Sequence, residues 1–175
     1  MDNSYVNAVD FFKLKEKNKL ASKLMLAAYE LRTPENVGAL IRLAGNLGIA
    51  KVFFIAVENS FKASKIARVA HSSIKHVAFE FCTPEEFLNR IPSDYVLVGV
   101  ETSQKASNLF TTKLPEKSIL LLGNERYGIP QDFLDRCRKT VFIPLLGKTL
   151  SMNVSHAAAL AAFEWGRQHS GLELM

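Results

Sequence analysis

Residues 119–130, ILLLGNERYGIP, and residues 143–155, IPLLGKTLSMNVS, are the two stretches that decide the fold of this chain. In each stretch, small and polar residues follow an apolar strand, and the second stretch then enters an alanine-rich helix. Open α/β sheets hold their ligands at this place, outside the carboxyl ends of the strands. Two such strand ends close together in the sequence therefore predict one composite pocket.

The rest of the chain alternates short apolar runs with amphipathic segments, which indicates an α/β fold with a parallel sheet flanked by helices. Continuous apolar runs are typical of strands that are buried on both faces of such a sheet. The expected strands are 25–31, 51–57, 76–82, 95–100, 118–122 and 140–143. The expected helices are 34–47, 63–70, 84–90, 130–136 and 153–168.

The helix over 34–47 has the clearest boundaries. Thr33 can cap it, Pro34 fits its first position, and Gly48 can end it. Gly38 lies inside this helix, where glycine costs about 1 kcal/mol relative to alanine. A ligand or a backbone that approaches closely would explain a glycine at that position.

Length and composition predict one globular domain over residues 24–175, preceded by a lysine-rich arm or short helix over 1–23. The net charge of +5 fits a polyanion partner such as RNA, although many proteins without such a partner share it. No signal-peptide pattern and no apolar run of about 20 residues is present, so we expect a cytoplasmic protein without a membrane partner. Neither cysteine has a metal-ligand spacing, which fits free thiols in a reducing compartment.

Familiar nucleotide and metal motifs are absent from the sequence. Gly147-Lys148-Thr149 resembles the end of a phosphate-binding loop, but that loop needs a glycine where this chain has Phe142. The segment from Gly123 to Gly128 does not have the dinucleotide-binding spacing. The four histidines lack companions at metal-ligand spacing, so we expect no metal.

Four polar residues at the ends of these elements carry two interpretations each. Arg42 either faces solvent or serves a site, and Glu125 either faces water in a turn or orients a guanidinium by a bidentate bond. Ser151 and Asn153 begin the last helix, where Ser and Asn are ordinary caps. From the residue pattern alone, these alternatives stay open.

Three segments together resemble the three sequence motifs of the SpoU/TrmH family of RNA ribose 2′-O-methyltransferases. They are NVGALIR at 36–42, LGNERYG at 122–128, and IP at 143–144 followed by SMNVS at 151–155. Their order and spacing match the family, and the resemblance covers about residues 25–167. Met152 departs from the leucine that is usual there, a change that conserves side-chain volume.

The resemblance implies the SPOUT fold, in which a deep C-terminal trefoil knot follows a parallel sheet. It also implies a homodimer with the active site near the dimer interface, S-adenosylmethionine bound in the knot, and no metal. The residues that would bind this methyl donor are Gly123, Ile143 and Met152, with Leu122 and Thr102 as further candidates. The catalytic residue would be Arg42, and Asn36, Glu125, Ser151 and Asn153 would position it and the ribose.

Family members modify tRNA or ribosomal RNA, and the compact build of this chain favours tRNA. Candidate RNA contacts are Arg42, Lys62, Lys65, Arg68 and Arg126, although these basic residues equally fit solvated surfaces. The alternatives are a ribosomal RNA methyltransferase, a non-catalytic RNA-binding dimer of the same fold, or an unrelated nucleotide-binding α/β protein. Binding of S-adenosylmethionine would separate the methyltransferase from an NAD-type protein.

Overall fold

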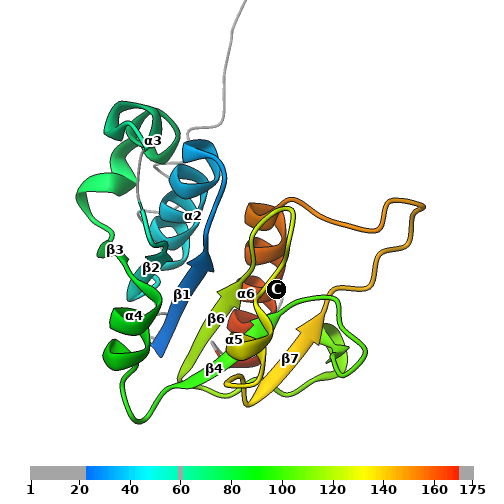
Figure 1. Cartoon of the computed structure of the whole chain (residues 1–175). Helices are drawn as coiled ribbons and strands as arrows, with labels where there is room; N and C mark the ends of the chain where they lie inside the picture. The colour runs from blue at the N-terminus through cyan, green and yellow to red at the C-terminus, as the bar shows by residue number, and fades with distance from the viewer. Residues whose placement is uncertain (1–22, 59–60, 170–175) are drawn as a thin grey trace, which may run out of the picture.

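The computed structural model describes residues 23–58 and 61–169, which form a parallel sheet with helices on both faces (Figure 1). The seven strands lie in the order β3-β2-β1-β6-β4-β7-β5, and every strand pairing is parallel. The strands are β1 (Leu24–Tyr29), β2 (Lys51–Ile55), β3 (Phe79–Cys82), β4 (Val96–Val100), β5 (Ser107–Asn108), β6 (Ser118–Leu122) and β7 (Lys139–Phe142). The predicted basic arm lies, except for Lys23, outside the described residues.

The helices form two layers, which pack against opposite faces of the sheet (Figure 1). They are α2 (Pro34–Leu47), α3 (Ala63–Ala70), α4 (Pro84–Arg90), α5 (Gln131–Leu134) and α6 (Val154–His169). Two short 3₁₀ turns, η2 (His71–Lys75) and η3 (Leu109–Thr111), complete the described elements. Figure 1 shows α2, α3 and α6 on one face, and α4 and α5 on the other.

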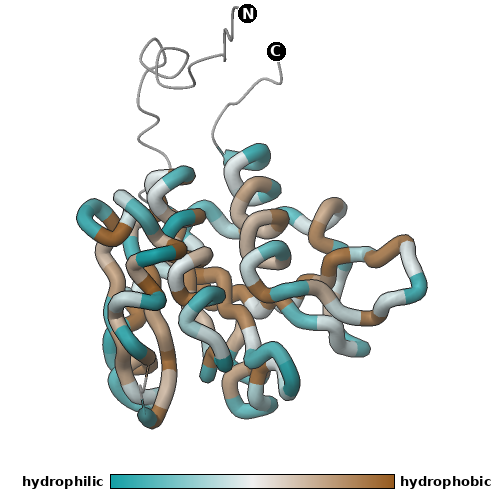
Figure 2. The backbone as a smooth tube through the Cα atoms, turned by 90° about the horizontal axis from the view of Figure 1, so that it is seen from above, coloured by the Kyte–Doolittle hydropathy of each residue, from teal (hydrophilic) through white to brown (hydrophobic). Residues whose placement is uncertain are grey.

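Strand β6 lies at the centre of the sheet, and all five of its residues are buried. Because side chains alternate between the faces of a strand, its apolar run serves two cores. Leu120 and Leu122 belong to the core beneath α2, α3 and α6, whereas Ile119 and Leu121 belong to the core beneath α4 and α5. Figure 2 shows the apolar strands enclosed between more polar helices. This arrangement confirms the prediction of a parallel sheet with buried strands.

Most predicted elements are present, with shifts of one or two residues at several ends and three larger differences. The predicted strand over 76–82 is shorter because the N–H groups of His76 and Val77 donate to Ser73 in the η2 turn, so β3 begins at Phe79. The predicted helix over 130–136 is a single turn, after which the N–H groups of Arg136 and Cys137 donate to the carbonyls three residues back instead of continuing the α-helical pattern. The two polar residues of β5 have no apolar run that would predict a strand. The trefoil knot stays a prediction.

Gly38 lets helices α2 and α3 approach closely. A Cβ atom at Gly38 would lie 2.7 Å from the Ile66 carbonyl oxygen and 2.7 Å from Val69 Cβ. Both distances are far below van der Waals contact, and one of these neighbours is backbone. Of the two explanations that the sequence allows for this glycine, the structure therefore supports the approaching backbone.

We expect Gly38→Ala to lower the free energy of unfolding by about 1–3 kcal/mol, since overpacking must push α2 and α3 apart. Urea unfolding measures this change. The matched control is Gly166→Ala in α6, where a Cβ would meet nothing within 4 Å. That substitution should instead stabilise the helix by up to about 1 kcal/mol. Equal effects at the two sites would contradict the packing argument.

Glu164 lies near the end of α6 and is only 6% exposed. Its carboxylate accepts hydrogen bonds from Arg167 at 2.7 and 2.8 Å and from Gln168 at 2.7 Å. Gln168 also donates to the Thr112 carbonyl and accepts from the Leu114 N–H. The Arg167 and Gln168 hydrogen bonds hold the pKa of Glu164 below its ordinary value, against the opposing effect of burial.

We expect Glu164→Gln to destabilise the protein at neutral pH more than in acid. A lowered folded-state pKa means that the ionised carboxylate stabilises the fold above the unfolded pKa, and that this stability is lost as pH falls through the folded pKa. The difference in unfolding free energy between the two proteins should therefore shrink below about pH 4. Urea unfolding at several pH values tests this, with Glu85→Gln on exposed α4 as the control. A pH-independent difference would contradict it.

Candidate active site

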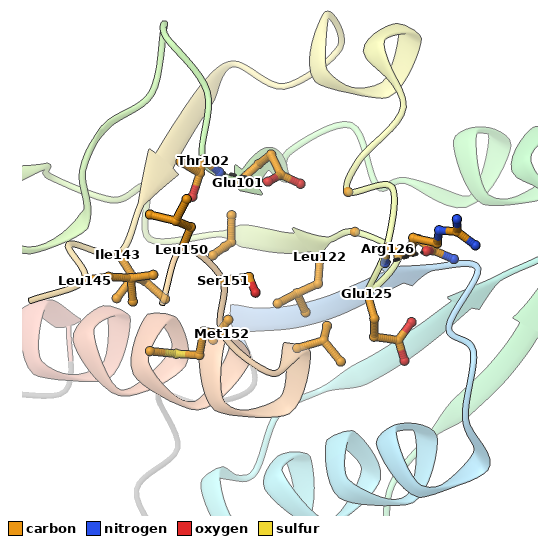
Figure 3. Close-up of a pocket in the computed structure, with 16 residues that line it drawn as sticks. Glu101, Thr102, Leu122, Glu125, Arg126, Ile143, Leu145, Leu150, Ser151 and Met152 are labelled. Carbon is orange, nitrogen blue, oxygen red and sulfur yellow. Dashed lines mark hydrogen bonds between the residues drawn. The ribbon is translucent and has the colours of Figure 1, made fainter. Parts of the chain in front are cut away.

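A pocket lies beyond the carboxyl ends of β4, β6 and β7, where the sequence predicts a composite site (Figure 3). Its volume is about 220 Å³. All five predicted donor-binding residues line it, namely Thr102, Leu122, Gly123, Ile143 and Met152. Three segments that are far apart in the sequence therefore meet here. The role of these residues in binding a methyl donor stays a prediction.

The loop from Gly123 to Gly128 forms one wall of this pocket. A Cβ atom at Gly123 would lie 2.2 Å from the backbone carbon of Gly128, so only glycine fits where the loop returns on itself. Gly128 itself has a φ of 71°, a conformation that favours glycine. The backbone N–H groups of Asn124 and Gly128 each donate to the carbonyl of the other. The loop is thus closed by its own backbone.

Asn124 holds the inside of this loop with its side chain. Its Oδ1 accepts from the backbone N–H groups of Arg126 and Tyr127 at 2.8 and 3.2 Å. Its Nδ2 donates to the Glu30 carbonyl at 2.5 Å, which ties the loop to the end of β1. Glu30 has a positive φ of 42°. Asn124 therefore sets the shape of the loop that presents the next residue, Glu125.

Glu101 fixes the opposite side of the pocket. Its carboxylate accepts from the backbone N–H of Thr102 and from the backbone N–H of Ile129, both at 2.9 Å. These bonds join the segment after β4 to the end of the glycine loop. Figure 3 shows Glu101 and Thr102 at one end of the pocket, and Glu125 and Arg126 at another.

A continuous hydrogen-bond network joins Glu125 to two of its predicted partners. Asn36 Nδ2 donates to the Glu125 carboxylate at 2.6 Å, and Asn153 Nδ2 donates to Asn36 Oδ1 at 3.1 Å. Asn153 Oδ1 in turn accepts from Ser155, from both its N–H and its hydroxyl. Asn36, in the first turn of α2, thus connects Glu125 to Asn153, the residue just before α6. The Glu125 carboxylate therefore accepts from an amide and a backbone N–H rather than from a guanidinium of the same chain, and Asn153 caps α6 as Asn commonly does. The catalytic roles of Glu125 and Asn153 stay predictions.

The local sequence explains why this network forms. Thr33 caps α2 by accepting from the Asn36 N–H, which places Asn36 in the first turn of the helix. Asn36 is only 9% exposed, so its amide needs partners on both sides. The backbone N–H of Arg32, just before this helix, donates to both Glu125 oxygens at 3.0 and 3.2 Å.

Arg42 and Ser151 lie differently from these three residues. Ser151 lines the pocket and is exposed. Arg42 is exposed on α2, and its guanidinium has no hydrogen bond or ion pair to any described residue. Six residues along a helix correspond to about 9 Å and about 120° of rotation, so Arg42 and Asn36 leave α2 on different sides. Within one chain, the structure does not bring Arg42 to Glu125.

The predicted RNA contacts fall into two groups. Arg126 lines the pocket, with its guanidinium 5.2 Å from the centroid of the Tyr127 ring. Lys62 caps α3, and Lys65 and Arg68 lie exposed on it. Since α3 packs against α2, this basic group lies beside the helix that carries Asn36 and Arg42. Their contacts with RNA stay predictions.

Sequence reasoning missed Glu101 and the structural roles of Asn124 and Arg32. Glu101 follows the apolar run of β4 just as Glu125 closely follows that of β6, so the same signal would have found it. An asparagine after a glycine at a strand end is typical of a turn held by its own side chain, which describes Asn124. Arg32 contributes only its backbone N–H to Glu125, and no sequence pattern reports such a contact.

The residues of this pocket fit S-adenosylmethionine by their chemistry. Apolar side chains from β4, β6 and the loop before α6 line it beside loop backbone that offers N–H and C=O groups. Glu101 and Glu125 also line it, and carboxylates complement the positive sulfonium and ammonium groups of this molecule. Among residues 23–58 and 61–169, no group of three or more His, Cys, Asp or Glu residues is placed to hold a metal ion. No helix in that part of the chain is long and apolar enough to cross a membrane.

The residues of this site fall within a match to a known protein family. The profile of the SpoU rRNA Methylase family matches residues 23–163. The chain therefore belongs to the SpoU rRNA Methylase family. The match spans the sheet, the glycine loop, the network at Glu125 and most of α6.

Individual relatives act on different RNA molecules. The chain is 31% identical over 157 residues to the tRNA (guanosine(18)-2′-O)-methyltransferase TARBP1 of Mus musculus, covering 86% of this chain and 10% of that protein. It is 30% identical over 156 residues to the 23S rRNA (guanosine-2′-O-)-methyltransferase RlmB of Blochmanniella floridana, covering 89% of this chain and 61% of that protein. The chain thus spans only part of the length of either relative.

A solved structure described as giving insights into the 2-OH methylation of C/U34 on tRNA is also similar. It superposes with a TM-score of 0.74 and 29% sequence identity, covering 83% of this chain and 95% of that chain. The fold of the solved chain therefore corresponds to that of this chain over 95% of the solved chain's length.

Proposed function

We propose that this protein transfers a methyl group from S-adenosylmethionine to a ribose 2′-hydroxyl of structured RNA. One observation carries the proposal: the Glu125–Asn36–Asn153 network forms beside a pocket that all five predicted donor-binding residues line. Membership of the family and the names of the relatives support it.

The chain's own residues have two tasks in such a transfer. S-adenosylmethionine, when bound, supplies a methyl carbon that its sulfonium already activates. The protein must hold the 2′-hydroxyl in line with that carbon, and alignment of this kind can supply about 7–11 kcal/mol. Hydrogen bonds from Asn36 and Arg32 hold the Glu125 carboxylate at the pocket. There it can accept hydrogen bonds from polar groups of the bound molecules and orient them.

The hydroxyl must also lose a proton, and Arg42 is unsuited to take it. A guanidinium keeps its proton in proteins and therefore has no free lone pair with which to accept another. We propose that Arg42 stabilises the developing alkoxide and grips the adjacent phosphate, which receives the proton. A planar, permanently charged guanidinium suits both tasks.

In the homodimer that the resemblance implies, Arg42 of one copy can reach the active-site pocket of the other. Arg42 leaves α2 away from Asn36, so we propose that it reaches the pocket of a second copy. Exposed apolar side chains support an interface: Phe163 on α6 is 58% exposed, and Leu146 before α6 is fully exposed. Figure 2 shows the loop before α6 projecting at the right of the molecule, with apolar segments on it.

We propose tRNA as the substrate in preference to ribosomal RNA, and the cytoplasm as the location. Names of both substrate classes occur among the relatives. A tRNA methyltransferase is among the relatives at 31% identity, and the solved structure described for methylation of tRNA is 29% identical to this chain. The free thiols of Cys82 and Cys137 fit a reducing compartment.

Transfer of labelled methyl from S-adenosylmethionine to unmodified bulk tRNA and, separately, to ribosomal RNA tests this function. Digestion of the product to nucleosides shows whether the label lies on the ribose 2′-oxygen. We expect label in tRNA. Label in ribosomal RNA alone would overturn the substrate assignment, and no label together with no binding of S-adenosylmethionine would overturn the enzymatic function.

A further inference from the structure

A second pocket lies at the same edge of the sheet, beyond the carboxyl ends of β1 and β2. Its volume is about 460 Å³, within the range that holds small organic ligands. Phe54, Phe61 and Phe81 give it an aromatic lining, and the rings of Phe54 and Phe81 lie 5.1 Å apart. Its charged lining residues, all exposed, are Glu30, Arg32 and Glu58.

Hydrogen bonds join this second pocket to the active-site network. Arg32 lines the second pocket, and its backbone N–H donates to Glu125, which lines the first. Glu30 also lines the second pocket, and its carbonyl accepts from Asn124 Nδ2. The two pockets therefore lie on either side of one junction. When the first pocket holds the methyl donor, a nucleotide with its ribose at this junction has the second pocket beside it.

Basic side chains follow the lining of the second pocket along the chain. Phe61 lines the pocket, and Lys62 follows it directly as the cap of α3. Lys65 lies about one turn further along, and both lysines are exposed. An RNA strand that places a base in the pocket would have its backbone phosphates near these cations, which favour a polyanion.

We propose that the second pocket holds a base of the RNA substrate, turned out of its helix, and prefers bases with an exocyclic amino group. Bases are bound in this way by stacking on aromatic side chains. The carboxylates of Glu30 and Glu58 accept hydrogen bonds from amino groups, which guanine, adenine and cytosine carry and uracil lacks. The inference rests on the proposed function and adds base recognition to it.

Titration of the ¹⁵N-labelled full chain with the four ribonucleoside monophosphates, followed by NMR, tests base binding without turnover. We expect GMP, AMP or CMP to shift the amides of residues 30–32 and 56–58, and UMP to shift them less. No shift at about 10 mM nucleotide, or shifts confined to residues 123–128, would overturn the proposal. Equal shifts with UMP would overturn the preference for amino groups.

Two variants test the same pocket with RNA. We expect Phe61→Leu and Glu58→Gln to raise the KM for RNA about tenfold, while the affinity for S-adenosylhomocysteine stays within about twofold of the wild type. The matched controls are Phe110→Leu, an exposed phenylalanine beyond β5, and Glu85→Gln. A rise in KM that is equally large in the controls would overturn the proposal. Base binding without methyl transfer would overturn only the proposed function, and transfer without base binding only this inference.

Discussion

Replacing Arg42 by lysine is expected to lower kcat for methyl transfer by about 10²–10³ while leaving the binding of S-adenosylmethionine unchanged. Loss of one well-placed group that stabilises developing charge has an effect of this size. Lysine keeps the charge but not the planar fork that grips an alkoxide and a phosphate together. Because Arg42 is exposed and bonds to no described residue, the variant should fold normally. Single-turnover kinetics with bound RNA measure the change directly.

The control is Arg90→Lys on α4, on the opposite face of the sheet, where arginine pairs with Glu86. Near-complete retention of turnover in Arg42→Lys would contradict a special role for the guanidinium. Mixing inactive Arg42→Ala and Glu125→Ala chains then tests where Arg42 acts. Recovery of activity in mixed dimers is expected if Arg42 serves the pocket of a second copy, and its absence would contradict that placement.

Exchanging the amide and the carboxylate between positions 36 and 125 is expected to restore stability but not turnover. In Glu125→Gln alone, the new side-chain NH₂ group must face a donor, either the Asn36 amide or the Arg32 backbone N–H. Asn36→Asp alone places two carboxylates at the present 2.6 Å contact. Each single change should cost about 1–3 kcal/mol of unfolding free energy, as expected when buried polar groups lose their partners. In the double variant, the new amide at position 125 donates to the new carboxylate at position 36 and accepts from the Arg32 N–H, so every pair is restored except the longer of the two Arg32 contacts.

Turnover of the three variants distinguishes the role of the hydrogen bonds from the role of the carboxylate charge. Glu125 lines the pocket and Asn36 does not, so the double variant moves the carboxylate away from the substrate side. We expect kcat to stay about 10²-fold below the wild type in all three variants. A double-mutant cycle in urea gives the coupling energy, with Glu85→Gln as the control for simple loss of a carboxylate. Recovery of both stability and turnover would show that the network, and not the position of the charge, matters.

The sheet and its main helices could be predicted because burial leaves a local record in the sequence. The aliphatic run of β6 predicts a strand buried on two faces, and Thr33, Pro34 and Gly48 mark both ends of α2. The convergence of Gly123, Ile143 and Met152 could also be predicted, since carboxyl ends of parallel strands share one edge. The specific roles of these residues came from a resemblance to a family and not from their pattern.

Other features depend on contacts between distant segments, which no local pattern records. Asn36 and Glu125 are 89 residues apart, and Asn36 and Asn153 are 117 apart, so their pairing requires the completed fold. The reason for Gly38 is visible only once α3 lies against it. The second pocket is built from residues that appear in the sequence as unremarkable core phenylalanines and turn acids.

The two walls of the first pocket differ in how much order they have before any ligand arrives. The glycine loop is held by Asn124 and by its own backbone, whereas residues 145–152 make no hydrogen bond to any described part of the chain and are exposed. A ligand or partner that fixes this second segment must offset the conformational entropy that it loses. Burial of Leu146 and Leu150 in the same event would give binding a negative heat capacity change. We therefore expect the change in heat capacity on binding, measured by calorimetry, to become smaller in magnitude when Leu146 and Leu150 are replaced by serine.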